Sequence, residues 1–195
     1  LHITTLDMTD GDVTIIATGN VVIDSITGGS GAIALTSTTG SITIGSIQGA
    51  GAVTLTASTG SVTLGSAGTT VEMDSLAVVA QGAITVYEQD ALVIETIQST
   101  DGAPVTVVAG GSVTLNGAIT AAGANAVNLT TTAGDIVLNQ SVTTSTGDVT
   151  LTAAGDMVLG TAGDLVSASG DLTVISGGAI TMTGETEVNA GTGVI

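Results

Sequence analysis

Two stretches decide the fold: GAIALTSTTGSITIGS at residues 31–46 and GAVTLTASTGSVTLGS at residues 51–66. They are identical at ten of sixteen positions, and the second begins just after the first ends. Within each stretch, apolar residues alternate with Thr, Ser or Ala, which is the period of a half-buried β-strand. Related phrases recur along the whole chain. Self-similarity at this spacing predicts an array in which each unit buries its apolar face against its neighbours.

The first apolar residue of each phrase forms one aligned column. Its members follow one another at intervals of about 20 to 23 residues, except for one longer step from Leu76 to Val105. A second and a third short strand are expected within each unit. A left-handed hexapeptide helix would need a strict multiple of six residues per coil. We therefore predict an all-β fold, a right-handed parallel β-helix (β-solenoid) of about eight coils of about 20 to 23 residues, with three short strands per coil. The column consists of Val13, Ile33, Val53, Leu76, Val105, Val127, Val149, Leu172 and Val194.

The array is expected to form a single β-solenoid over residues 1–195, without a cap at either end, so that both ends present open sheet edges. The longer step predicts one irregular coil, residues 72–97, with an insertion at residues 87–91. Insertions in solenoids usually bulge as loops on one face. This loop is either a tolerated surface loop or a binding loop formed by Tyr87, Glu88 and Asp90.

The charge balance excludes several classes of function. The chain has 17 acidic residues, no Lys or Arg, and a net charge of −17. Binding to nucleic acid phosphates, or to an anionic membrane surface, needs cationic side chains. Membrane insertion is not expected either, because the longest apolar run, residues 76–80, is far shorter than a membrane span. There is no cysteine, so no disulfide can form.

The sequence does not predict an enzyme. A lyase on a β-helix would usually take its base from Lys or Arg, which are absent. A hydrolase could pair two carboxylates, either Glu88 with Asp90 or Glu72 with Asp74. Sugar sites also favour aromatic platforms, however, and Tyr87 is the sole aromatic residue among Phe, Trp and Tyr. No cofactor is expected.

Aspartates recur at predicted corners of the coil. Asp135 and Asp156 form one pair, and Asp148 and Asp171 form another, with the two members of each pair in successive coils. Stacked corners lie about 5 Å from one another, and like charges at that separation repel. Two interpretations are open: a Ca²⁺ ion bridges each pair through oxygen ligands, or each Asp closes its turn by hydrogen bonding to the backbone.

The G-x-[VI]-x-[LI] phrases at residues 31–44, 51–64 and 147–159 resemble the repeats of large bacterial exoproteins of the filamentous-haemagglutinin type and related adhesins. The resemblance covers nearly the whole chain. It implies a right-handed β-helix, export to the cell surface or the medium, and a role as stalk, adhesin or fibre. The absence of Lys and Arg departs from most such proteins and argues against binding of sulfated glycans.

Three functions follow as expectations. The first is a structural extracellular β-solenoid, a filament subunit or a shaft or stalk segment, which associates with itself end to end through its open edges. The second is an adhesin module that contacts a cell-surface glycan or protein through the loop of the fourth coil. The third is an ice- or surface-binding array of outward threonines, although Thr is also an ordinary strand former on an exposed face.

Overall fold

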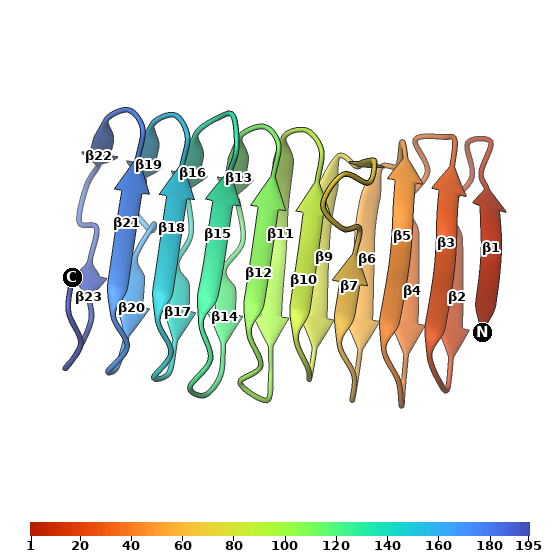
Figure 1. The fold of residues 1–195 in the computed structure, drawn as a ribbon, viewed down its shortest axis with the longest axis horizontal. Coiled ribbons are helices and arrows are strands. Elements are labelled where there is room, and N and C mark those ends of the chain that lie inside the picture. Colours follow the sequence, from red (N-terminus) through yellow and green to blue (C-terminus); the bar gives the residue numbers. More distant parts are fainter.

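The computed structural model describes every residue from Leu1 to Ile195 and consists of 23 strands, arranged as two parallel sheets that face each other. The front sheet in Figure 1 contains β1 (His2–Asp7), β3 (Val21–Thr27), β5 (Ile42–Gln48), β7 (Val62–Leu64), β8 (Val71–Glu72), β10 (Ile84–Glu88), β12 (Val105–Ala109), β15 (Val127–Thr131), β18 (Val149–Ala153) and β21 (Leu172–Ser176). The back sheet contains β2 (Val13–Ala17), β4 (Ile33–Ser37), β6 (Ala52–Ala57), β9 (Ser75–Ala80), β11 (Leu92–Ser99), β13 (Val113–Leu115), β14 (Ile119–Ala121), β16 (Ile136–Leu138), β17 (Val142–Thr144), β19 (Met157–Leu159), β20 (Leu165–Ser167), β22 (Ile180–Met182) and β23 (Val188–Asn189).

The chain coils about one long axis. In Figure 1 the front strands run upward and the back strands run downward, while the chain advances from its N-terminus on the right to its C-terminus on the left. This is a right-handed coil, the hand expected for parallel strands joined by crossovers. The front sheet has nine strands along its path, one per turn. The predicted right-handed β-solenoid is therefore confirmed, and its number of turns is close to the expected eight. No helix is present that is long and apolar enough to cross a membrane.

The core is a stack of aliphatic layers between the two sheets. It contains 45 buried apolar residues in one continuous cluster. Strand alternation builds it: in β5, for example, Ile42 and Ile44 face inward and Thr43 faces solvent. In the front sheet Ile42 pairs with Val62, which pairs in turn with Ile84. A β-branched or Leu side chain therefore meets a similar one in the next coil, and this arrangement fills thin layers without aromatic rings.

The second and third strands of each predicted unit are not always separate. In β3 and β5 they run on as one long strand of seven residues, bent where two outward residues follow each other, such as Gly45 and Ser46 in β5. In the C-terminal half they are two strands of two or three residues, such as β13 and β14. The predicted three short strands per coil thus describe the C-terminal half, whereas the N-terminal coils have a bend in place of the third corner.

The sequence alignment of the fourth unit is wrong. Leu76 lies on the back sheet, where it pairs with Ile94, whereas Val105 lies on the front sheet, where it pairs with Ile84. The segment from Leu76 to Val105 therefore makes one and a half turns, not one turn with an insertion. The same phrase is on the back sheet before this point and on the front sheet after it. Successive front strands, such as those that begin at Ile84 and Val105, keep the repeat of about 20 to 23 residues throughout.

The extra residues lie elsewhere than predicted. On β5, Ile44 and Ile47 are three positions apart, but their partners Leu64 and Val71 in the next coil are separated by residues 65–70. This segment forms a loop that leaves the row of strands beside β7 (Figure 1). Residues 87–91, predicted as the insertion, instead form the end of β10 and the turn into β11. Residues 72–97 do contain one irregularity, a register shift between β9 and β11 near Glu95.

Candidate functional site

Two clefts lie side by side where the coil changes its phase. The larger one, the loop cleft, has a volume of about 420 Å³. It is lined by Ser66, Ala67, Gly68, Thr69, Thr70, Tyr87, Glu88, Gln89, Val108, Gly110 and Thr132. The smaller one, the acidic cleft, has a volume of about 200 Å³. It is lined by Gly49, Ala50, Glu72, Met73, Asp74, Glu88, Asp90 and Ala91. Glu88 is the residue that the two linings share.

The loop at residues 65–70 holds its shape by local hydrogen bonds. The Thr69 hydroxyl donates to the Ser66 carbonyl oxygen at 2.9 Å and accepts from the Ser66 backbone N–H at 2.8 Å. Gly65 and Gly68 have φ angles of 68° and 86°, which residues with a side chain rarely adopt. The wall of the loop cleft is therefore preformed. Sequence reasoning missed this loop, although two glycines interrupting the strand alternation marked it.

Glu88 faces the interior of the solenoid. It continues the inward face that Ile84 and Val86 begin on β10, while Tyr87, between Val86 and Glu88, faces outward. Only 5% of the Glu88 surface is exposed. Neither carboxyl oxygen has a hydrogen-bond partner. A buried polar group without a partner is uncommon and calls for a physical explanation.

The environment of Glu88 favours its neutral form. Burial away from water is the largest cause and, with the negative charges of Asp90 and Glu72, raises the pKa of Glu88 from 4.5 to about 8. The backbone N–H groups of Asp90 and Met73 act in the opposite direction, but neither meets the geometry of a hydrogen bond to the carboxyl group. Glu88 is therefore mainly protonated at neutral pH, which avoids the cost of a buried, unpaired charge.

The three predicted binding residues lie near one another but do not form one loop. Tyr87 is half-buried and lines the loop cleft, Glu88 faces inward, and Asp90 is exposed in the turn and lines the acidic cleft. Glu72 and Asp74, the other carboxylate pair considered from the sequence, approach the same turn from β8 and the residues after it. The sequence did not indicate that the two pairs line one cleft, because the alignment assigned the extra residues to the wrong segment.

The four predicted metal ligands occupy stacked corners, as expected. Each uses one carboxyl oxygen to accept a backbone N–H of the next coil: Asp135 Oδ1 accepts from Asp156 at 2.7 Å, and Asp156 Oδ1 accepts from Ala179 at 2.8 Å. Asp148 Oδ1 accepts from Asp171 at 2.9 Å, and Asp171 Oδ1 accepts from Val194 at 2.8 Å. These carboxyl groups satisfy backbone donors at corners between strands. No group of three or more His, Cys, Asp or Glu side chains is placed to hold a metal ion. The bridging role of Ca²⁺ stays a prediction.

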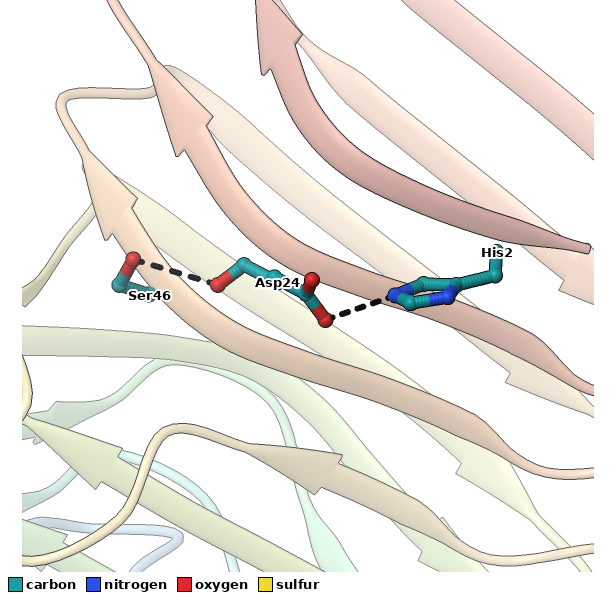
Figure 2. Close-up of polar contacts among 3 residues, drawn as sticks. All are labelled: His2, Asp24 and Ser46. Atoms are coloured by element: carbon teal, nitrogen blue, oxygen red, sulfur yellow. Dashed lines mark hydrogen bonds and ion pairs between the residues drawn. The ribbon is translucent and has the colours of Figure 1, made fainter.

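The sole histidine has a partner that the sequence did not reveal. His2 Nε2 lies 2.9 Å from Asp24 Oδ1 on β3, and the backbone carbonyl oxygen of Asp24 accepts a hydrogen bond from the Ser46 hydroxyl (Figure 2). Both His2 and Asp24 are at least half exposed, at 62% and 50% of their side-chain surface. A side-chain contact this exposed contributes little to stability, so we assign it no functional role.

Outward threonines form a row across four successive coils of the front sheet. On the front sheet Thr43 pairs with Thr63, Thr63 with Thr85, and Thr85 with Thr106. Asn128 interrupts the row in the next coil. Thr106 joins this row because the half-turn change of phase places the strand that begins at Val105 on the front sheet. A surface-binding role for the row stays a prediction.

The comparisons with known proteins agree with the repeat architecture. A family described as repeats of unknown function (DUF5649) matches residues 146–195, which lie in the C-terminal coils with split back strands. No curated protein and no solved structure matches the chain. The family match and the fold together show a β-solenoid repeat protein, and they provide no evidence of likeness to filamentous haemagglutinin.

Proposed function

We propose that this chain is a structural shaft or filament segment that works outside the cell. The observation that carries the proposal is the unbroken core, one cluster of 45 buried residues running from the first coil to the last. A rod of stacked coils resists bending because parallel ladder hydrogen bonds run along its axis in every coil. Side-chain acceptors at the corners add further links between coils, as Asp12 does for the Ala32 N–H at 2.8 Å.

Association end to end is part of this proposal. On β22, Ile180 and Met182 occupy inward positions, yet 51% and 50% of their surfaces are exposed. Their partners one coil earlier, Met157 and Leu159, are buried. Apolar edge strands of this kind favour pairing with a further coil. A second copy of the chain supplies such a coil if it is rotated by half a turn about the rod axis, so that its β1, at the edge of its front sheet, pairs with β22 and β23 at the edge of the back sheet.

Electron microscopy and sedimentation of the purified chain test this proposal. We expect rods that lengthen with concentration. Replacing Ile180 and Met182 by Asp places charge on the apolar edge and should shift the distribution to single rods. Thr181→Asp is the matched control, because Thr181 lies between them on β22 and faces outward. A wild-type chain that stays monomeric at all concentrations would overturn the end-to-end part of the proposal.

A second candidate function is a binding module that contacts a cell-surface glycan or protein. The loop cleft favours it, because the cleft is preformed and contains Tyr87, the sole aromatic side chain among Phe, Trp and Tyr. Aromatic rings provide large contact areas for ligands. Binding of labelled protein to cells and to a glycan array tests this candidate. We expect Tyr87→Ala to abolish binding with the circular dichroism spectrum unchanged, whereas equal binding by wild type and variant would exclude the cleft.

A further inference from the structure

The acidic cleft is lined by an unusual number of carboxyl groups. Four of its eight lining residues are acidic: Glu72, Asp74, Glu88 and Asp90. The chain has no Lys or Arg, so no cationic side chain of these types balances them, and the sole histidine, His2, contacts Asp24. Charge of one sign lining a cleft raises the local concentration of oppositely charged ligands.

Glu88 provides a second and independent sign of a ligand. Its surface is only 5% exposed, and both carboxyl oxygens are without partners. Three arrangements satisfy such a group: protonation, a hydrogen-bond donor or a cation. The backbone N–H groups of Asp90 and Met73 approach this carboxyl group without meeting the geometry of a hydrogen bond, and the chain has no Lys or Arg to supply a cation. The ordinary solution in a protein core would be an apolar residue, as at Ile84 and Val86 on the same face of β10.

The shape and chemistry of the cleft favour an organic cation over a bare metal ion. No three acidic side chains are placed to coordinate a metal, whereas Ca²⁺ takes six to eight oxygen ligands. A cleft of about 200 Å³ is large for an ion, and Ala50, Met73 and Ala91 add apolar wall beside the carboxyl groups. An ammonium group with an aliphatic stem matches both features, since the stem can pack on apolar surface while the charged end reaches the acids.

We propose that the acidic cleft binds a protonated primary alkylamine, with ionised Glu88 as the partner of the ammonium group, Glu72 and Asp90 beside it, and the aliphatic stem against Met73. The proposal does not depend on the filament or on the loop cleft. Binding transfers the Glu88 proton to the buffer, because the empty site holds this carboxyl group neutral. The ammonium group then neutralises what would otherwise be a buried, unpaired charge.

A dependence on pH follows from this coupling. The titratable groups around Glu88 are Glu72 on β8, Asp74 after β8, and Tyr87 and Asp90 on its own segment. Strand β12 and residues 49–51, which also lie near Glu88, contain no titratable side chain. Primary alkylamines resemble the Lys side chain, with a pKa of about 10.4, so the ligand stays charged below about pH 9. The apparent Kd therefore falls about tenfold per pH unit up to pH 8 and then levels off.

The test uses the purified chain, with butylamine as probe and butanol as the uncharged ligand of similar shape. Amide chemical shifts of Gly49, Met73 and Asp90 report binding at pH 6, 7, 8 and 9. We expect saturable shifts with butylamine only. Glu88→Gln should weaken binding at least tenfold at pH 8, and Glu72→Gln a few-fold. Glu187→Gln, an exposed acid near the C-terminus, is the matched control and should leave the Kd unchanged.

Two further titrations identify the source of the cation. A blocked lysine peptide that binds with the affinity of butylamine supports a lysine side chain of a partner protein, and weaker binding supports a free amine. Calcium chloride that saturates the site while butylamine does not would overturn the proposal. So would equal affinity of the wild type and Glu88→Gln, or an apparent Kd that does not change between pH 6 and pH 8.

Discussion

Replacement of Glu88 by Gln should make the chain more stable, and increasingly so as the pH rises. Glu88 has an ordinary pKa of 4.5 in the unfolded chain and about 8 in the folded one. Between these two values the folded state binds more protons than the unfolded state, so the free energy of unfolding falls with rising pH. Below pH 4.5 the acid is neutral in both states and contributes no pH dependence. Above pH 8 it is charged in both, and the loss is complete.

The size of the effect follows from the two pKa values. The difference between 4.5 and about 8 corresponds to at most about 5 kcal/mol of lost stability above pH 8, and about 3 kcal/mol at pH 7. Water in the adjoining clefts screens the charge and reduces both figures. Gln has nearly the shape of Glu but does not titrate. The variant therefore lacks the fall in unfolding free energy that Glu88 causes between pH 4.5 and pH 8. The advantage of Glu88→Gln in unfolding free energy should therefore grow by up to about 5 kcal/mol from pH 4.5 to pH 8.

Urea unfolding at several pH values measures this difference. Tyr87 fluorescence reports the coil next to Glu88, since no other Phe, Trp or Tyr is present, and circular dichroism reports the whole rod. Glu95→Gln is the control, because Glu95 is an exposed acid on the neighbouring strand β11 and its variant should keep the slope of the wild type. If the curves for wild type and Glu88→Gln run parallel from pH 4.5 to pH 8, Glu88 is not a buried neutral acid and the reasoning fails.

Three further predictions concern the corners of the coil. Gly117→Ala should destabilise the chain by about 1–3 kcal/mol, because the added Cβ would overlap the Glu95 carbonyl oxygen. Gly11→Ala is the control: its added Cβ meets open space, so the melting temperature should stay nearly unchanged. Asp156→Ala should cost about 1 kcal/mol, because the next coil's backbone N–H loses its acceptor, and Asp10→Ala serves as its exposed control. If backbone N–H groups alone satisfy these corner carboxylates, EDTA should not lower the melting temperature. A melting temperature that falls with EDTA and recovers with Ca²⁺ would instead support Ca²⁺ bridges between the stacked corner aspartates.

The fold class was predictable because two periods in the sequence have direct physical causes. Alternation of Val or Ile with Thr reports which residues of a strand are buried. The longer period, about 20 to 23 residues, reports the length of one turn. Gly51 shows why glycine recurs with that period: a Cβ there would lie 2.4 Å from the Ser30 carbonyl oxygen, so the corner requires a residue without a side chain.

The phase of the coil was not predictable in the same way. A phrase such as residues 105–109 fits the front sheet as well as the back sheet, since both present an aliphatic interior to it. Only the count of turns distinguishes them, and the segment from Leu76 to Val105 is ambiguous between a turn with an insertion and one and a half turns. Glu88 was nevertheless within reach, because its place two positions after Val86 already puts it on the inward face.

The change of phase also explains where the clefts lie. Before it the long bent strands, such as β5, are on the front sheet, and after it their equivalents are on the back sheet, beginning with β11. Strand β8 pairs with β5 but has no ladder partner in the next coil, where β10 pairs with β7. The loop at residues 65–70, the register shift near Glu95 and both clefts fall in this transition. Regular coils leave little room between neighbours, because their side chains and backbone fill it. A ligand site in this rod is therefore expected at the transition and not along the regular coils, and the unpartnered carboxyl group of Glu88 lies there.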